Sequence, residues 1–476
     1  MQHAWNMSML LSLFALVAPV PTFAHILGPN HAWGGRSSNI VQKDVVVIGG
    51  GAAGTYATVR LQQEGKSVAL IEKKNRLGGH VDTYIDPTTG NPFDYGVIYY
   101  GNSSVTRNFF DYVGVEMESS LQEKTQVYAN FNTGAKVANS VVANETGNFQ
   151  AAIGAWMKQL EKYPWLTDQT GFHLPATIPE ELFLPFGEYI EKYNLGGFTT
   201  LLSYTAQQGN LLETPTFYFM KWLNIPSSGF GGIWQKDQNN QKIYDAAFNK
   251  LGGASNVYLS SKVDAVRRNS WGVEVCFSTP SGQYIVRASQ LIMAIPPKID
   301  NLGFLDISST EQSLFMQLQN NYISTGVVLN SGLPDASVVI NFDTTQPFGI
   351  PPAPVNPVLS GASLISNAAF TQWASPNYTS PDAIEAGMLA DVDRLQKSLN
   401  FTVPAGTKPT LAQVSDHSPY FIHVSEEAIK SGFYDKVNAL QGQKRTWWTG
   451  ATFESEDTAN IWNFTNVEIL PRVLKA

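Results

Sequence analysis

A glycine-rich turn between a short strand and a helix constrains the fold of this chain more than any other feature. The turn is Gly49-Gly50-Gly51-Ala52-Ala53-Gly54, and it directly follows a β-branched run at residues 44–48. Residues 55–64 have the composition of a helix, and residues 67–71 form a second apolar run. Short apolar runs of this kind are typical of strands in a parallel sheet that is buried on both faces. The pattern therefore predicts a unit of strand, helix and strand, with the glycines at the first connection.

The glycines at positions 49, 51 and 54 have the G-x-G-x-x-G spacing of a dinucleotide-binding turn. Gly49 permits the tight turn, Gly51 lets the backbone approach a pyrophosphate, and Gly54 lets the helix pack closely on the strand. Ala53 lies in the same turn, where the helix N-terminus attracts negative charge. Glu72 ends the second strand 18 residues after Gly54, and a carboxylate there can accept hydrogen bonds from ribose hydroxyls. This context predicts a bound dinucleotide in contact with these five residues.

Further segments resemble the FAD signature of the flavin amine oxidase and phytoene desaturase group. They are Arg76-Leu77-Gly78-Gly79-His80 after Glu72-Lys73, Lys262-Val263, Ala294-Ile295-Pro296-Pro297 and Trp447-Trp448-Thr449-Gly450. In that group the paired glycines make a second close backbone contact with the dinucleotide. The strand that corresponds to Lys262-Val263 holds the adenine. The resemblance implies FAD as the cofactor. It adds the following residues to those expected to bind it: Arg76, Gly78, Gly79, His80, Val263 and Gly450.

Within this group the chain is most similar to the β-cyclopiazonate dehydrogenase family. The similarity rests on an apparent secretory leader, on the triplet Gly78-Gly79-His80, and on a tail that runs from Trp448-Thr449-Gly450-Ala451 to Asn460-Ile461-Trp462-Asn463. Members of that family are flavoproteins that oxidise fungal natural products by taking hydride from a C–H bond, in some cases with ring closure. The resemblance implies similar chemistry here.

His80 is the most informative single residue of the second glycine segment. If Gly78 and Gly79 contact the cofactor, the following side chain lies near it, and an imidazole there can bond covalently to the flavin. Many relatives have arginine at the matching position. Two interpretations therefore stay open, a covalent tether to FAD and a hydrogen bond to it. The nearby Asp94-Tyr95-Gly96 is either an acidic group near the flavin or a simple turn.

Three candidate catalytic residues, His417, Tyr420 and His423, fall within seven positions of one another. Each can act as an acid, a base or a hydrogen-bond donor in a substrate pocket, and each can equally be a satisfied structural side chain. The two histidines are six residues apart, which matches no common metal-ligand spacing. We therefore expect no metal.

The pattern along the chain predicts two interleaved domains of an α/β protein. A Rossmann-type FAD-binding domain is expected from residues 43–100, 230–304 and 433–476, after a linker at 26–42. A mixed α+β substrate domain is expected from residues 101–229 and 305–432, which include helical stretches at 149–162, 179–193 and 216–223. The architecture expected is flavin amine oxidase-like.

The first 24 residues and the composition address location and partners. Residues 7–20 are almost entirely apolar and precede Pro21-Thr22-Phe23-Ala24, which predicts a signal peptide cleaved after Ala24 and, after cleavage, a secreted or lumenal protein with no membrane span. An uncleaved anchor is the alternative.

Net charge is −8 and no Lys/Arg-rich run is present, which argues against nucleic acid as a partner. The lone Cys276 is expected to be an inert core residue. Five sequons follow the leader, at Asn102, Asn144, Asn377, Asn400 and Asn463. We expect all of them except Asn463 to carry glycans.

The sequence therefore predicts an FAD-dependent oxidoreductase that takes hydride from a small organic metabolite, with dioxygen as the acceptor because only one nucleotide fingerprint is present. Three alternatives remain: a secreted flavin amine or amino-acid oxidase, a flavin-dependent isomerase of polyenoic fatty acids, and a non-enzymatic protein that retains a nucleotide.

Overall fold

The structure is a computed structural model that describes residues 39–119, 124–199, 201–202, 209–224, 232–403 and 406–476. The expected signal peptide at residues 1–24 lies outside the described residues. Residues 39–476 form a single unit by their contacts, and that unit is built on two large sheets. The domain boundaries expected from the sequence stay a prediction.

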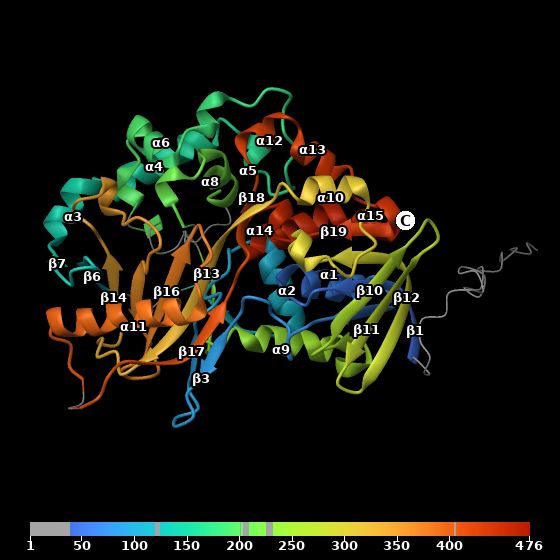
Figure 1. The fold of residues 1–476 in the computed structure, drawn as a ribbon, viewed down its shortest axis with the longest axis horizontal. Helices are drawn as coiled ribbons and strands as arrows, with labels where there is room; N and C mark the ends of the chain where they lie inside the picture. Colours follow the sequence, from blue (N-terminus) through green and yellow to red (C-terminus); the bar gives the residue numbers. More distant parts are fainter. Residues whose placement is uncertain (1–38, 120–123, 200, 203–208, 225–231, 404–405) are drawn as a thin grey trace, which may run out of the picture. The chain divides into compact units, whose positions relative to one another are not determined.

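A seven-stranded sheet carries the glycine-rich turn (Figure 1). Its order is β10-β11-β12-β1-β2-β9, and β19 pairs with the C-terminal end of β12. The pairs β12–β1, β1–β2, β2–β9 and β12–β19 are parallel, whereas β10, β11 and β12 form an antiparallel meander. The strands are β1 (Asn39–Ile48), β2 (Val68–Ile71), β9 (Val257–Tyr258), β10 (Lys262–Arg268), β11 (Val273–Thr279), β12 (Gly282–Met293) and β19 (Thr446–Trp448).

Strand β1 begins at Asn39, so the predicted linker up to Gln42 is wrong at its end. The first residues of β1 pair in parallel register with Tyr284 to Ala288 of β12. Strand β12 is 12 residues long and therefore extends the ladder beyond the buried part of β1. No side chain before Val45 is buried in β1, so the apolar pattern gave no sign of these residues.

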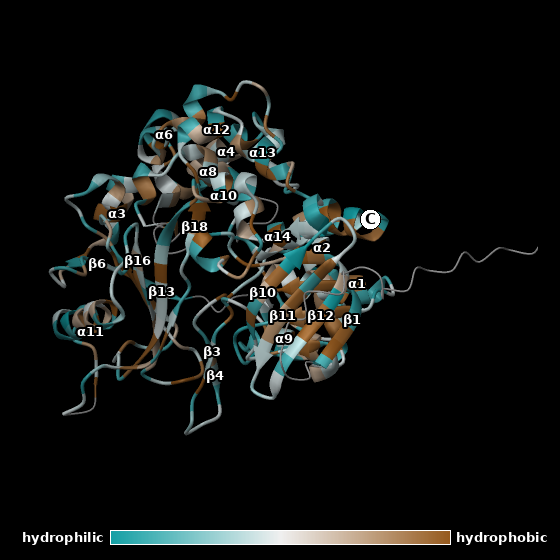
Figure 2. Cartoon of the chain, turned by 45° about the vertical axis from the view of Figure 1, so that its right-hand side comes forward, coloured by the Kyte–Doolittle hydropathy of each residue, from teal (hydrophilic) through white to brown (hydrophobic). Residues whose placement is uncertain are grey.

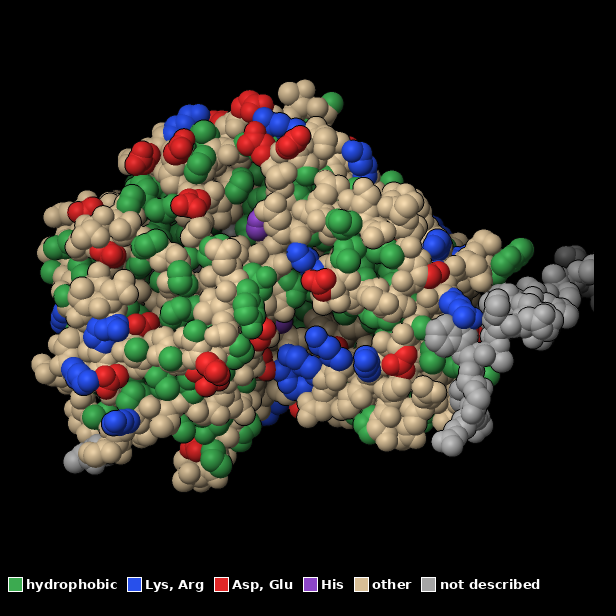
Figure 3. Space-filling model, viewed as in Figure 1, with side chains coloured by type: hydrophobic (Ala, Val, Ile, Leu, Met, Phe, Trp, Pro, Cys, Tyr) green, Lys and Arg blue, Asp and Glu red, His purple; other side chains and the backbone are tan. Residues whose placement is uncertain are grey.

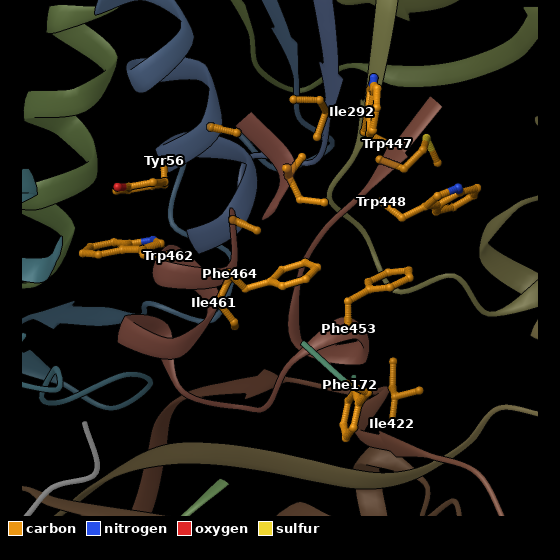
Figure 4. Packing of buried hydrophobic residues seen from close by; sticks show 14 of the residues in the cluster. Tyr56, Phe172, Ile292, Ile422, Trp447, Trp448, Phe453, Ile461, Trp462 and Phe464 are labelled. Atoms are coloured by element: carbon orange, nitrogen blue, oxygen red, sulfur yellow. The ribbon is translucent and has the colours of Figure 1, made fainter. Parts of the chain in front are cut away.

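Helix α1 (Ala52–Gln63) follows the glycine-rich turn and is almost entirely covered. It contacts α9 (Gln241–Lys250), α14 (Thr458–Phe464) and α15 (Leu470–Lys475), while α2 (Ser104–Val113) packs on α9 and α14. A π-helical segment, Thr465–Ile469, joins α14 to α15. The ring of Trp462 stacks on Tyr56 at 5.4 Å, and its indole N–H donates to the carbonyl of Ala52 at 3.0 Å (Figure 4). The last helices therefore hold the first one in place.

An eight-stranded, mostly antiparallel sheet forms the second layer, in the order β17-β13-β16-β15-β14-β6-β7, with β18 also paired to β13. Helix α11 (Pro381–Ser398) contacts β16 and β17 and buries Met388, Val392 and Leu395. In Figure 2, α11 carries both hydrophilic and hydrophobic residues, whereas long stretches of β11 and β12 in the first sheet are hydrophobic. The strands are β6 (Thr125–Ala129), β7 (Lys136–Val137), β13 (Gln319–Leu329), β14 (Ser337–Asn341), β15 (Val358–Gly361), β16 (Ala369–Ser375), β17 (Thr410–Asp416) and β18 (Tyr420–His423).

Short helices cover one end of the second sheet (Figure 1). The predicted helix over residues 179–193 is wrong in its first half, where a 3₁₀ turn at Glu180–Phe183 precedes α6. Pro185 separates the two because proline cannot donate the backbone hydrogen bond that a continuous helix needs. The remaining helices are α3 (Asn139–Thr146), α4 (Phe149–Leu160), α5 (Pro164–Thr167), α6 (Phe186–Tyr193), α8 (Thr216–Trp222), α10 (Ser309–Phe315), α12 (Glu426–Lys430) and α13 (Phe433–Asn438).

Two small antiparallel ribbons complete the part of the chain that the structure describes. They are β3 (Thr83–Ile85) with β4 (Pro92–Asp94), and β5 (Met117–Glu118) with β8 (Trp234–Gln235). No helix among these residues is long and apolar enough to cross a membrane. Cys276 is buried in β11, where burial raises the pKa of its thiol.

Candidate functional site

The glycine-rich turn leaves no room for side chains at two of its three motif positions. Gly49 has a φ of +104°, and a Cβ there would lie 2.7 Å from the carbonyl oxygen of Ala294. A Cβ on Gly54 would overlap the carbonyl oxygen of Gly49. These contacts hold β1, α1 and the residue after β12 together, as the motif predicts.

Gly51 and Gly79 face each other and form the cradle of the candidate cofactor site. A Cβ on Gly79, whose φ is +60°, would lie 2.9 Å from the Cα of Gly51. The amide of Gly78 donates to the carbonyl of Gly50 at 2.8 Å, which joins the second glycine segment to the first. Gly51 is also the N-cap of α1, and no side chain caps that helix and no acidic residue lies in its first turn.

This arrangement fits a dinucleotide diphosphate. Both glycine backbones are partly accessible, and side chains at either position would fill the cradle. The first-turn N–H groups of α1 are directed at the same place, and they favour an anion.

Glu72 braces the glycine-rich turn from inside the protein. Its Oε2 accepts a hydrogen bond from the amide of Gly50 at 2.6 Å, and its Oε1 accepts from the amide of Lys74 at 2.7 Å. The ammonium of Lys74 in turn donates to the carbonyl of Gly79 at 2.9 Å. The carboxylate thus sets the shape of the cradle, and its expected contact with a ribose stays a prediction.

Gly450 and the glycine-rich turn lie at the same edge of the first sheet. The register places Ile48, Met293 and Trp448 side by side at the carboxyl ends of three parallel strands. Gly450 follows with a φ of +119° and no atom within 4 Å of a would-be Cβ. In α/β sheets, ligands bind outside the carboxyl ends of the strands. Below this loop, Figure 4 shows Phe453 among Trp448, Phe464 and Phe172.

Val263 lies at the start of β10, half-buried and paired with Phe277. The amide of Ser261 just before it donates to the backbone carbonyl of Glu72 at 2.9 Å. The start of β10 is therefore beside the end of β2, on the adenosine side that the motif predicts, and the adenine contact stays a prediction.

Arg76 is engaged by protein groups in the structure. Its guanidinium pairs with Asp82 and also donates to the side-chain oxygen of Gln241 at 3.2 Å. The other carboxylate oxygen of Asp82 is 2.8 Å from Nε2 of His417. Asp82 therefore links a residue expected to bind the cofactor to one expected to act in catalysis, and the direct contact of Arg76 with FAD stays a prediction.

The charge state of Asp82 determines which nitrogen of His417 carries a hydrogen. Burial alone raises the pKa of Asp82, but the hydrogen bond from His417 and the charges of His417, Arg76 and Lys74 lower that pKa to about 2. The carboxylate is ionised at neutral pH and can only accept, so Nε2 of His417 carries the hydrogen. His417 itself is 5% exposed.

His80 lies directly beside this pair. Its ring stacks on that of His417 with centroids 4.7 Å apart, and Tyr420 lies 6.0 Å away. Burial lowers the pKa of His80 well below 6.5, and the charges of His417 and Lys74 lower it further. A Cβ on Gly96 would overlap the carbonyl of His80, so this glycine allows the chain to pass. The imidazole is mostly buried and is uncharged at neutral pH.

The other two catalytic candidates, Tyr420 and His423, lie at opposite ends of β18. Tyr420 is on the His80 side, where burial and the charge of Glu456 raise its pKa well above 10. His423 instead lies 5.9 Å from the ring of Tyr218 in α8, and its Nδ1 donates to the carbonyl of Phe421 at 2.8 Å. The structure brings His417 and Tyr420 to His80, and it gives His423 different neighbours. Catalytic roles for all three stay predictions.

Sequence reasoning missed three acidic residues of this region. Asp82 holds His417, Glu456 accepts the amide of Phe421 at 2.8 Å, and Glu454 pairs with Lys221 of α8 at 2.9 Å. Burial raises the pKa of both Glu454 and Glu456 to about 7. The only sequence signal for them is the acidic run Glu454-Ser455-Glu456-Asp457, which closely follows the segment Trp447-Trp448-Thr449-Gly450. Among the described residues, no group of three or more His, Cys, Asp or Glu side chains could hold a metal ion.

Comparison with known proteins agrees with the cofactor site. Residues 47–113 match the family model of the NAD(P)-binding Rossmann-like domain. The chain is 35% identical to the FAD-dependent oxidoreductase oblC of Cochliobolus heterostrophus, with 92% of each protein covered. It is 30% identical to beta-cyclopiazonate dehydrogenase of Aspergillus oryzae, with 91% of this chain and 93% of that protein covered.

A solved structure supports the fold. The CLA-producing fatty acid isomerase from P. acnes superposes with a TM-score of 0.72 at 17% identity, covering 91% of this chain and 98% of that one. Likeness at this identity shows the fold alone, a Rossmann-type FAD-binding domain joined to a mixed α+β part as in the flavin amine oxidases. From the sequence relatives, the chain belongs to the family of FAD-dependent oxidoreductases that includes beta-cyclopiazonate dehydrogenase.

Proposed function

We propose that this enzyme oxidises a fungal natural product of terpenoid, polyketide or indole type by taking hydride from a C–H bond. The observation that carries the proposal is that His80 directly follows Gly79 of the cradle and its ring lies 6.0 Å from that of Tyr420, with both side chains mostly buried. FAD bound in this cradle supplies the hydride acceptor at N5. The oxidoreductases oblC and beta-cyclopiazonate dehydrogenase support this choice of chemistry.

The protein groups at the site can orient a substrate by hydrogen bonding. The raised pKa of Tyr420 keeps its hydroxyl protonated, so it can donate a hydrogen bond to a substrate oxygen or nitrogen. Hydride leaves with both electrons of the C–H bond, so the carbon becomes cationic. Either a proton then leaves to give a double bond, or a nucleophile of the same molecule closes a ring. Dioxygen takes the two electrons and two protons as hydrogen peroxide.

Comparative metabolite profiling tests the reaction. A producing strain without this protein should accumulate a precursor two hydrogens heavier than its product, and the purified holoenzyme should convert that precursor with one peroxide formed per molecule. An isomerised product without oxygen uptake would favour the fatty acid isomerase instead. Release of an imine from an amine would favour an amine oxidase, and unchanged flavin absorbance with every candidate would favour a binding protein.

We further propose that His80 tethers FAD covalently. A neutral imidazole carries a nucleophilic lone pair, and His80 is uncharged, mostly buried and adjacent in sequence to Gly79 of the cradle. In the reaction, the imidazole N–H and one C–H of the flavin 8-methyl group break, and a C–N bond forms. Dioxygen accepts the two hydrogens as hydrogen peroxide, which balances the step.

Acid precipitation tests the tether. Flavin should stay with the precipitated wild-type protein and add the mass of FAD to the peptide that contains His80. The variant His80→Asn should release its flavin into solution. Flavin released from the wild-type protein would instead leave His80 with a hydrogen-bonding role only.

We also propose that the protein is secreted or lumenal and glycosylated. The four sequon asparagines expected to be modified, Asn102, Asn144, Asn377 and Asn400, are all exposed, whereas Asn463 is half-buried and donates to the carbonyl of Gln169 at 3.1 Å. Deglycosylation of protein made in a fungal host should lower its mass, and peptide mapping should find Asn463 unmodified. An unchanged mass together with an intact leader would contradict the proposal.

A further inference from the structure

A chain of contacts from Arg76 through Asp82 and His417 ends on the ring of His80. We propose that His417, held by Asp82, is a positioning residue that orients the imidazole of His80 for its bond to the flavin. The inference rests on the proposed tether, and it concerns how that bond comes to form.

The orientation of His417 is fixed at two points. Its Nε2–H donates to Asp82 at 2.8 Å, and its backbone amide donates to the carbonyl of Ile323 in β13 at 2.9 Å. Asp82 is held in turn by the guanidinium of Arg76. The plane of the His417 ring is therefore set by the fold.

His80 rests on that plane. The two imidazoles lie 17° from parallel with centroids 4.7 Å apart, so the face of His417 limits the rotation of His80 about its side-chain bonds. The backbone of His80 is held by the amide of Val97, which donates to its carbonyl at 3.1 Å. One ring face is thus covered, and the side chain as a whole is mostly buried.

The charges around His80 come from two separate parts of the chain. Burial has the largest effect on its pKa and lowers it; the charges of His417, Lys74 and Lys73 lower it further, and that of Asp82 raises it. Tyr420 is the remaining titratable ring within 6.0 Å, and its raised pKa keeps it neutral. Among these groups, His417 and Tyr420 come from a distant part of the chain. Figure 3 shows Lys and Arg side chains gathered beside a recess in this face of the molecule. The groups facing His80 are Lys73, Lys74, Asp82, His417 and Tyr420.

Replacing His417 should therefore give a defect in tether formation that depends on pH. In His417→Gln the stacked ring and its charge are lost while an N–H donor for Asp82 is kept, and the pKa of His80 moves towards its ordinary value. The tethered fraction of bound flavin should fall about fivefold at about pH 8, where the lost ring face acts alone, and up to about fourfold further at about pH 6, where a histidine with its ordinary pKa of about 6.5 is only about one quarter uncharged. Asp82→Asn, which frees His417, is the milder second variant and should lower the rate of tether formation at both pH values.

The matched control is the exposed His173, whose Nε2 lies 3.9 Å from Oε2 of Glu468. His173→Gln should tether flavin as the wild type does. The measurement is in-gel flavin fluorescence after denaturation, divided by flavin bound to the native holoprotein, so that loss of FAD binding is scored separately.

The outcomes separate this inference from the tether itself. If the wild type is tethered and His80→Asn is not, but both His417→Gln and Asp82→Asn tether normally at both pH values, His417 has no positioning role. An equal defect at both pH values in His417→Gln would overturn the part about charge. Flavin released from wild type overturns the tether and this inference together.

Discussion

At the scale of single residues, Gly54 has the least space in the glycine-rich turn. A methyl group there would overlap the carbonyl of Gly49 and lie 3.0 Å from the Cβ of Ala294. Because buried backbone cannot move far without breaking strand pairing, Gly54→Ala should destabilise the fold by at least about 3 kcal/mol and abolish FAD binding. Thermal unfolding and flavin absorbance measure both effects. Gly303→Ala is the control, since nothing lies within 4 Å of its would-be Cβ, and an unaffected Gly54→Ala protein would contradict the steric argument.

Glu454 gives a prediction about pH. Its pKa in the folded protein is about 7, raised by burial despite the charge of Lys221, whereas an unfolded glutamate titrates at about 4.3. A raised pKa means that the stabilisation is complete below the unfolded value and is lost as pH rises through about 7.

Going from about pH 7.5 to about pH 5.5 should thus stabilise the wild type relative to Glu454→Gln by on the order of 2 kcal/mol. Thermal midpoints of both proteins at the two pH values test this. The same midpoint shift in both proteins would show that Glu454 does not titrate in this range.

Residues whose roles depend on near neighbours in sequence could be predicted, and those that depend on distant ones could not. The constraints on Gly49, Gly51 and Gly54 all follow from a single turn and its flanking elements, so their spacing was informative. Asp82 and His417 are 335 positions apart, and neither segment contains a sign of the other. The sequence therefore indicated a histidine worth testing but not the carboxylate that holds it.

At the scale of elements, β18 is held by a side chain from the loop that follows β19. Phe421 has a φ of +48°, a strained value for a residue other than glycine, and its amide donates to Glu456 at 2.8 Å. The amide of Ile422 contributes a second hydrogen bond to the same carboxylate. Since Tyr420 precedes Phe421 directly, Glu456 fixes the end of β18 that faces His80.

Glu456→Gln should lower turnover without loss of FAD. Its amide can accept only one of the two backbone N–H groups and presents a donor to the other, so β18 shifts and Tyr420 moves. We expect kcat to fall about ten- to hundredfold with flavin content unchanged. The exposed Glu427→Gln on α12 serves as the control. Full turnover in Glu456→Gln would mean that this anchor is dispensable.

Element boundaries show where patterns fail. The strand β2 covers the last four residues of the apolar run predicted at 67–71. All four are buried, and their apolar side chains made the strand predictable. The start of β1 has exposed side chains and is a strand only because β12 extends beside it. The helix expected at residues 179–193 from its aromatic-rich composition is interrupted at Pro185, because composition alone does not weigh the position of a proline.

At the scale of the whole described unit, α14 joins distant parts of the chain. Trp462 is fully buried, stacks on Tyr56 of α1 and lies 4.6 Å from the ring of Phe109 in α2. Its N–H also satisfies the carbonyl of Ala52 in the first turn of α1.

Trp462→Ala should therefore destabilise the protein by about 3 to 5 kcal/mol and weaken FAD binding, and added FAD should recover part of the lost midpoint. Trp271→Ala is the control because that side chain is 70% exposed. Thermal unfolding with and without FAD measures both effects. Equal midpoints for the two variants would contradict a joining role for Trp462.

The site as a whole was predictable in its cofactor half and not in its substrate half. The FAD half depends on repeated backbone geometry, which leaves glycines at fixed spacings. The substrate half depends on side chains from β18, α8 and the loop after β19 that meet only through long-range packing, such as Lys221 with Glu454. Such pairs carry no fixed spacing, so the sequence identified the cofactor and left the substrate open.

The pairing of β19 with β12 has a consequence for how the protein is made. The first glycine segment is translated early, but the sheet edge beside it is complete only when residues 446–448 have joined β12. During synthesis the nascent chain therefore exposes an unfinished nucleotide site with an open strand edge until its last segment emerges. We therefore expect stable cofactor binding only after residues 446–448 have emerged and paired with β12.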